Sequence, residues 1–422
     1  FLKRRVLMRI LPIILFSLFV FTESSGMELS IDEAVDYAMK NNLDLKAKRE
    51  ELNVAKGNLT TAITYPFNPE ISLEGRNLLS SGENEKTSYR FGEKNEYSLS
   101  ISQTLETGGQ RSLRKDIALK NEDIVQLEIV DMERLLTGEV KREFYNLIFL
   151  EDKLKLTDLS IGLNQKLLDV AEKRFRSGDA PKMDVNLTMV ELKKVENEKT
   201  KVTGLFSISK ARVSSLLGLS PDTEIILRRD EDLTPPLKDM DLKGLKEMAI
   251  KNRPDIINFE IKEKAISEEI LLTRADVSPD VRVSLLYNRD YDKEVYGAGV
   301  SIPIPVVNRN RGQIETLMAQ KLRLNTMRES LKLLIEKEIE SAWLRVDTAK
   351  KSLKLFKEDI LPQLKENADG LKRAYDAGRV GIFAIIIEHQ KLISNTSAYY
   401  DSLYEYNTAL VDLEAASAGG MK

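Results

Sequence analysis

The sequence contains a single histidine, and that histidine stands beside a carboxylate. His389 follows Glu388 in the segment IIIEHQ, and the chain has no cysteine. Adjacent residues of a helix point in different directions, so the two side chains do not converge on a metal ion, and we expect them on a helix surface. Methionines such as Met132 and Met318 are scattered and are expected to fill packing gaps. The sequence therefore predicts no metal site, no cofactor and no catalytic residues.

Two glycine-bearing turns are the next candidates for chemistry, because glycine-rich loops can bind phosphate. ETGGQR (106–111) and NRNRG (308–312) each follow a β-like segment, and neither has the lysine-plus-hydroxyl pattern of a phosphate loop. Gly108, Gly109 and Gly312 permit positive φ angles, so we expect them at junctions from strand to helix. The net charge of −3 with interspersed signs predicts no nucleic-acid partner.

Long helical segments are interrupted twice by similar clusters of small residues. The first break reads KRFRSGDAPKMDVN (173–186) and the second reads RAYDAGRVGIFAII (373–386). In each break an aromatic residue, Phe175 or Tyr375, lies three positions before a glycine, Gly178 or Gly378. The pattern predicts one helical hairpin tip built twice, at about 176–183 and about 376–383.

The rest of the chain is duplicated in the same register. LSIDEAVDYAMKNNLDLKAKREEL (29–52) resembles LKGLKEMAIKNRPDIINFEIKEKA (242–265). We predict two repeats, 27–218 and 242–416, each with two helices, two strands, a long helix, a tip and a long helix. A proline-bearing linker, 219–241, joins them, and 417–422 forms a tail.

Four segments alternate with a period of two, at about 69–79, 96–106, 279–288 and 295–305. The apolar faces carry Ile71, Leu73, Gly75, Tyr97, Leu99, Ile101, Leu105, Val281, Val283, Leu285, Tyr287, Tyr296, Ala298, Val300, Ile302 and Ile304. The opposite faces carry Ser98, Ser100, Ser102, Arg282, Ser284, Gly297, Gly299 and Ser301. This alternation is typical of barrel strands between lipid and water, although half-buried strands of a soluble sheet alternate too. Four strands cannot close a barrel, so the first interpretation requires oligomers.

The helices are predicted to be unusually long. From 113 to 175 there is no proline, and apolar residues recur mostly three, four or seven positions apart. Such a helix would measure on the order of 90 Å. The second copy, 313–375, contains Pro362, where we expect a kink. A composition with 31% charged and only 6% aromatic residues suits such helices better than a bulky core.

The N-terminal residues have the pattern of a secretion signal. Basic residues precede the apolar run ILPIILFSLFVF (10–21), and small residues follow it. The run is too short to span a bilayer, so we predict a signal peptide, 1–26, rather than an uncleaved anchor. Because no cysteine follows, we expect no lipidation. The true start is expected at Met8 or upstream of this sequence.

With these stretches the chain resembles the TolC family of outer membrane efflux proteins, from Leu29 to about Ala416. The segments that carry the resemblance are LSIDEAVDYAMKNNLDLKA, NPEISLEG, ISQTLETGGQRS, RFRSGDAPKMDV, VSIPIPVVNRNRGQI and AYDAGRVGI. SQTLETGGQR and IPIPVVNRNRGQI look most like the branch that serves exporters of heavy-metal cations, of the cobalt-zinc-cadmium and copper-silver kind. The fold class implied is mainly α, with four strands per protomer completing a trimeric barrel continued by a long helical tunnel.

The resemblance also implies partners and a location. It implies a homotrimer in the lipid of a Gram-negative-type outer membrane, extending into the periplasm. A periplasmic membrane-fusion adaptor and an inner-membrane pump of the RND type would deliver the substrate. The function implied is a passive exit duct, not an enzyme. Ducts for organic compounds or for type I protein secretion remain alternatives, as does a periplasmic coiled-coil scaffold or adaptor without a channel.

The hairpin tips are where the resemblance places function, at the periplasmic entrance docked by the adaptor. The tip residues carried over by position are Arg174, Phe175, Gly178, Asp184, Tyr375, Gly378, Arg379 and Val380. The family often has an acidic residue past each tip glycine, and Asp184 keeps it whereas Ala384 does not. The apolar second tip suggests a constriction that closes by packing and dewetting, formed by Ile382, Phe383, Ala384, Ile387 and Glu388. The alternative is that this segment only packs between helices. We expect the first tip mainly to meet the adaptor and the second to close the tunnel.

Overall fold

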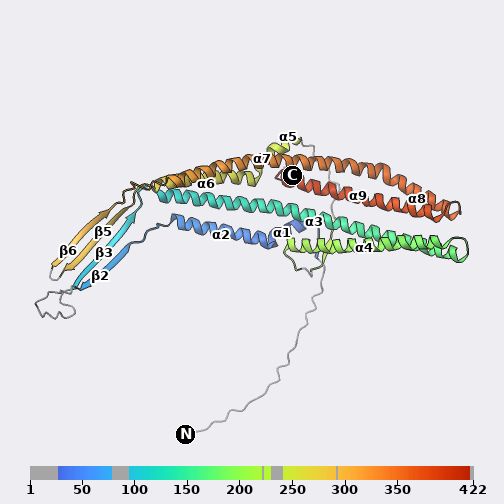
Figure 1. The fold of residues 1–422 in the computed structure, drawn as a ribbon, viewed down its shortest axis with the longest axis horizontal. Coiled ribbons are helices and arrows are strands. Elements are labelled where there is room, and N and C mark those ends of the chain that lie inside the picture. The colour runs from blue at the N-terminus through green and yellow to red at the C-terminus, as the bar shows by residue number, and fades with distance from the viewer. Residues whose placement is uncertain (1–26, 78–94, 221–222, 230–240, 291–292, 419–422) are drawn as a thin grey trace, which may run out of the picture.

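The computed structural model describes residues 27–77, 95–220, 223–229, 241–290 and 293–418. The expected signal peptide, 1–26, lies outside the described residues, as do most of the linker and the end of the tail. The described chain is elongated, with a sheet at one end and two helical hairpin tips at the other (Figure 1). The long helices run nearly parallel between these ends.

Both halves of the chain contain the same order of elements. The first half has β1 (Met27–Leu29), α1 (Ile31–Asn41), α2 (Leu43–Ile63), β2 (Glu70–Asn77), β3 (Asn95–Leu105), α3 (Gln110–Arg176) and α4 (Lys182–Leu217). β4 (Ile225–Leu227) lies in the linker. The second half has α5 (Leu242–Asn252), α6 (Pro254–Ala275), β5 (Val281–Asp290), β6 (Lys293–Ser301), α7 (Arg311–Leu355), a π-helical segment η1 (Phe356–Ile360), α8 (Leu361–Asp376) and α9 (Ile382–Ala416). The predicted fold class, mainly α with duplicated halves and four sheet strands, is confirmed.

Local sequence signals explain where several helices begin. The Ser30 hydroxyl accepts from the backbone N–H of Glu33, and the Glu33 carboxylate accepts from the backbone N–H of Ser30, which forms a capping box for α1. Asn42 caps α2 by accepting from the N–H of Leu45 at 2.9 Å. Pro254 occupies the first turn of α6, where a missing amide hydrogen is tolerated.

The two longest helical stretches differ in continuity. α3 runs for 67 residues without interruption, about 100 Å. Its counterpart changes to a π-helical turn at Phe356–Ile360, and α8 begins with Pro362 in its first turn. Because proline has no amide hydrogen to donate to the preceding turn, the α-helical hydrogen-bond ladder cannot pass through this point unchanged. The interruption therefore falls just before the proline at which a kink was expected.

The sheet is antiparallel, with the strand order β2-β3-β5-β6. Leu99 of β3 lies opposite Leu73 of β2 and opposite Tyr287 of β5, so the apolar residues of neighbouring strands share one face. The fourth strand was expected at about 295–305, but β6 ends at Ser301 and is therefore shorter at its C-terminal end. Ile302 and Ile304 lie beyond it, since Pro303 and Pro305 cannot donate to a strand ladder. The short parallel pair β1-β4 was not expected from the sequence.

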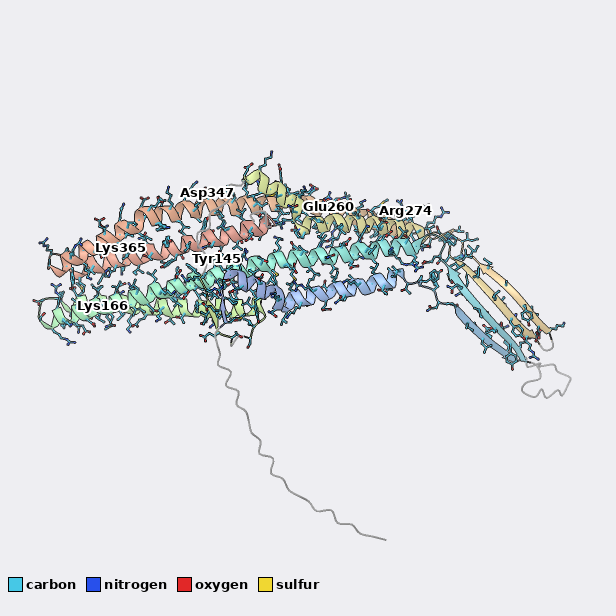
Figure 2. All side chains as sticks on the ribbon, turned by 180° about the vertical axis from the view of Figure 1, so that it is seen from behind. Tyr145, Lys166, Glu260, Arg274, Asp347 and Lys365 are labelled. Atoms are coloured by element: carbon cyan, nitrogen blue, oxygen red, sulfur yellow. The ribbon has the colours of Figure 1, made fainter. Side chains whose placement is uncertain are left out.

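The helices form one layer whose order follows that of the strands. Near the sheet, α2 contacts α3, α3 contacts α6 and α6 contacts α7. Toward the tips, α4 contacts α3, α3 contacts α9, and α9 contacts α7 and α8. Figure 2 shows the same arrangement from behind, with Lys166 on the first hairpin and Lys365 on the second, both toward the tip end. A single layer leaves both faces of the helices accessible in one protomer.

Each half has its own apolar core at mid-length. The first contains Phe144, Leu147 and Leu217, and the second contains Ile335, Ile339 and Leu413. Ion pairs between α3 and α9 join the halves, with Arg142 at 2.6 Å from Asp412 and Lys141 at 2.7 Å from Glu414. These cores and ion pairs hold the long helices together at mid-length. The hairpin tips extend from this central part in one direction and the sheet extends in the other.

Candidate functional site

The two hairpin tips share one backbone conformation. Gly178 has φ 83° and Gly378 has φ 70°, the left-handed region that glycine adopts without steric cost. The N–H of each glycine donates to the carbonyl of the aromatic residue three positions earlier, Phe175 or Tyr375, at 3.1 Å and 2.8 Å. The tips are therefore one structure repeated, and their differences lie in the side chains.

The segments after the glycines differ in chemistry. In the first tip Asp184 lies in the first turn of α4, where a negative charge is favourable next to the helix N-terminus. In the second tip Ala384 takes the corresponding place on α9, and no acidic residue lies in its first turn. The first tip therefore differs from the second by an acidic residue, Asp184, in the first turn of the helix that follows it.

The start of α9 forms an apolar contact between the two hairpins. Ile382, Ile385 and Ile386 are buried in a cluster with Leu167 and Ala171 of α3. Leu167 and Ala171 are not marked by any motif in the sequence, and only their spacing of four residues, which places them on one helix face, could have indicated this contact. This cluster fixes the second tip against the first.

The five residues expected at a constriction occupy different environments. Ile382 is 5% exposed and Glu388 is 7% exposed, both within one protomer. Phe383 is 57% exposed and Ile387 is 39% exposed, one helical turn apart, and Ala384 is half-buried. Packing between helices accounts for Ile382, which leaves Phe383 and Ile387 as the residues of this set that face outward from the protomer.

Polar contacts also join the two tips. The guanidinium carbon of Arg174 lies 5.4 Å from the ring centre of Tyr375, a cation–π contact between the first tip and the second. The Gln390 amide of α9 donates to the Glu191 carboxylate of α4 at 2.6 Å. Phe175, Gly178, Gly378 and Arg379 are exposed, and Val380 is half-buried. The tips thus meet at their sides while their ends stay open.

Glu388 and His389 do not form the helix-surface pair expected from the sequence. Packing of α9 buries the Glu388 carboxylate, which lies 3.7 Å from the Lys391 ammonium. Glu388 Oε1 and His389 Nδ1 have no hydrogen-bond partner among the described residues. Burial and the Lys372 charge lower the pKa of His389, against a smaller opposite effect of Glu388. His389 is therefore held in its neutral form more strongly than a free histidine.

The sheet presents one apolar and one polar face. Leu73 is 74% exposed and Leu285 is 66% exposed, and both lie on the apolar face. On the other face Arg282 pairs with Glu70 at 2.6 Å, and Ser98 donates to Asn288 at 2.6 Å. Among the described residues, no helix combines the length and apolar character needed to cross a membrane. The apolar face of the sheet is therefore exposed in one protomer.

Comparisons with known proteins agree with this architecture. Residues 34–219 match the model of the family described as outer membrane efflux protein. The cobalt-zinc-cadmium resistance protein CzcC of Cupriavidus metallidurans is 20% identical over 382 residues, which cover 90% of this chain and 88% of that protein. The pyoverdine export outer membrane protein OpmQ of Pseudomonas putida is 22% identical over 305 residues, which cover 67% of this chain and 62% of that protein.

A solved structure shows the same fold over nearly the whole length. The crystal structure of CusC superposes with a TM-score of 0.75 and covers 92% of both chains at 16% sequence identity. The resemblance inferred from the sequence is confirmed. Residues 34–219, most of the first repeat, thus match the family of outer membrane efflux proteins, and the chain as a whole is similar to CzcC in sequence and shares the fold of CusC.

Proposed function

We propose that three copies of this protein form a passive exit duct for heavy-metal cations in the outer membrane. A periplasmic adaptor and an inner-membrane pump of the RND type would deliver the cations to it. The main support for the proposal is that one chain combines a sheet suited to a membrane with helices much longer than a membrane is thick. A four-stranded sheet with an exposed apolar face continues into a layer of helices about 100 Å long.

Barrel closure is the step that requires three copies. Four strands leave two edges, β2 and β6, unpaired within one protomer. Three sheets joined edge to edge would give twelve strands, pairing every edge and surrounding the wall with lipid on its apolar face. The polar face, with Ser98, Arg282 and Asn288, would then line a water-filled interior.

The tips would have separate tasks at the periplasmic end. The first tip, with exposed Phe175 and the helix-starting Asp184, would mainly contact the adaptor. The second would close the tunnel, where three copies of Phe383 and Ile387 meet near the axis and exclude water. The burial of Ile382, Ile385 and Ile386 supports this division, because it holds the second tip firmly enough to act as a closure.

The heavy-metal substrate rests on likeness to CzcC, whose name records cobalt, zinc and cadmium resistance. A deletion strain tests it directly. We expect increased sensitivity to zinc, cobalt or copper, restored by the wild-type gene. As a matched comparison, the same strain is challenged with lipophilic toxins. Sensitivity confined to the organic toxins would contradict the metal assignment and favour an organic exporter, the class that the name of OpmQ indicates.

A further inference from the structure

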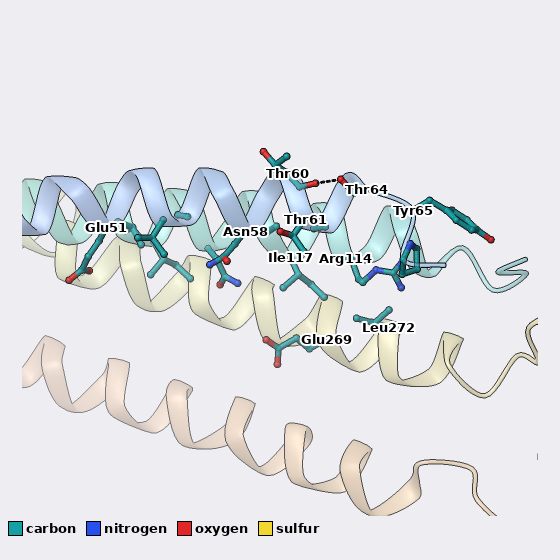
Figure 3. A pocket seen from close by; sticks show the side chains of 18 residues that line it. Glu51, Asn58, Thr60, Thr61, Thr64, Tyr65, Arg114, Ile117, Glu269 and Leu272 are labelled. Carbon is teal, nitrogen blue, oxygen red and sulfur yellow. Dashed lines mark hydrogen bonds between the residues drawn. The ribbon is translucent and has the colours of Figure 1, made fainter. Parts of the chain in front are cut away.

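A large groove lies beside α3, close to the sheet and far from the hairpin tips. It has a volume of about 1240 Å³ and is lined by residues of α2, α3 and α6 and of the segment 64–66 that follows α2 (Figure 3). These helices are consecutive in the layer, and both outer ones contribute to the lining. The groove therefore runs along α3 on one face of the layer.

Apolar atoms supply most of the exposed surface of the groove, although about half of its lining residues are polar or charged. Val54 of α2, Ile117 and Ile124 of α3 and Leu272 of α6 supply apolar surface, and the amide of Asn121 borders the same space. Sites for drug-sized ligands combine apolar walls with placed polar groups, and this groove is somewhat larger than most of them. A single metal ion would fill only a small part of this groove.

The charged side chains of the groove leave one unmatched carboxylate. Glu51 is paired with Lys48 at 2.6 Å, and Arg114 is paired with Glu106 at 2.7 Å. Glu269 lines the groove from α6, and among the described residues no ion pair or hydrogen bond involves its carboxylate. Burial raises the pKa of Glu269, and no cation counteracts that rise. A positive charge placed beside Glu269 would therefore stabilise its ionised form.

We infer that this groove binds amphiphilic organic cations of drug size, with Glu269 as the anionic anchor. The inference rests on the proposed duct, because the groove would lie in the duct wall, and it adds an organic substrate class. One carboxylate does not hold a divalent metal, which takes several ligands. Within the described residues, no three His, Cys, Asp or Glu side chains come together to hold a metal. The apolar walls would contact the rings or chains of the ligand, and its charge would meet Glu269.

Binding of rhodamine 6G, an amphiphilic fluorescent cation, to the purified full-length protein tests the inference by fluorescence anisotropy. We expect saturable binding to the wild type that excess zinc does not displace. Glu269→Gln should weaken the binding about fivefold, which is the upper end of the range measured for exposed ion pairs. Glu268→Gln is the matched control, because Glu268 is the adjacent carboxylate of α6 and does not line the groove. Asn121→Trp, at an exposed lining position, should fill the groove and abolish binding.

Three results would overturn the inference: no saturable binding to the wild type, equal weakening by Glu268→Gln and Glu269→Gln, or displacement of the dye by zinc. Conductance of the same preparations in planar bilayers separates this failure from that of the duct. Channels that conduct but bind no dye would refute the groove alone. Preparations that form no channel would refute the proposed function.

Discussion

The first and second hairpin tips have the same backbone but different surroundings. Both turns depend on a glycine in the left-handed region and on equivalent hydrogen bonds. Residues 186 and 386 occupy matching places, yet Asn186 is exposed while Ile386 is buried in the contact between hairpins. The comparison shows that the turn geometry is independent of the side chains that follow it. The chemistry of one tip can therefore differ from that of the other while the backbone conformation is the same.

Substitution by aspartate at positions 186 and 386 should give the largest difference between the tips in the free energy of unfolding. Ile386→Asp would bury a carboxylate among Leu167, Ala171 and Ile382 without a partner, and should lower the free energy of unfolding by roughly 3–5 kcal/mol. Asn186→Asp, the matched control, should change it by less than about 0.5 kcal/mol. Denaturant unfolding of the detergent-solubilised protein, followed by circular dichroism, measures both. Similar losses for the two variants would mean that the hairpins are not held together by this cluster.

A smaller and equal effect is expected at the two glycines. Gly178→Ala and Gly378→Ala each place a Cβ in the left-handed region and should each cost about 1 kcal/mol. No heavy atom lies within 4 Å of either added Cβ, so the backbone strain is the only local cost. Gly381→Ala is the control, because Gly381 has φ −80° and open space around it. A large difference between the two tip variants, measured in the same unfolding assay, would refute their equivalence.

The contact between Arg174 and Tyr375 tests whether the tips stabilise each other. A double-mutant cycle with Arg174→Ala and Tyr375→Leu should give a coupling energy of about 0.5–1 kcal/mol. Tyr375→Phe retains the ring and should retain most of that coupling. Because the contact links the two hairpins, protease cleavage at the tips should also become faster in the Arg174→Ala variant. Zero coupling would contradict a stabilising role for this contact and would leave the apolar cluster and the Gln390–Glu191 hydrogen bond to hold the tips together.

The smallest effect concerns pH and is confined to the second hairpin. The pKa of His389 lies below its usual value of 6.5, so the unfolded chain binds a proton more readily than the folded one. Stability should therefore fall as pH drops from about 6.5 through the folded pKa, and His389→Gln should remove this part of the pH dependence. Thermal unfolding at pH 7.5 and pH 5 compares the two proteins. An unchanged pH dependence in His389→Gln would contradict this role of burial.

Much of the architecture could be predicted from the sequence because it depends on local patterns. Strand alternation gave the apolar sheet face that Leu73, Leu99 and Tyr287 share, and the duplicated glycines marked both turns. Burial of Glu388 could not be predicted, since it depends on how α9 packs against distant helices. The groove beside Glu269 was missed for the same reason, because its walls come from segments far apart in the sequence.

The central claim is that this chain forms a water-filled duct only as a trimer. The most direct test combines the mass of the detergent-solubilised protein with its conductance in planar lipid bilayers. We predict a trimer that opens stable ion-conducting channels, with larger or more frequent openings after Phe383→Ala and Ile387→Ala, whose side chains would close the second tip. A monomer without conductance would contradict the account.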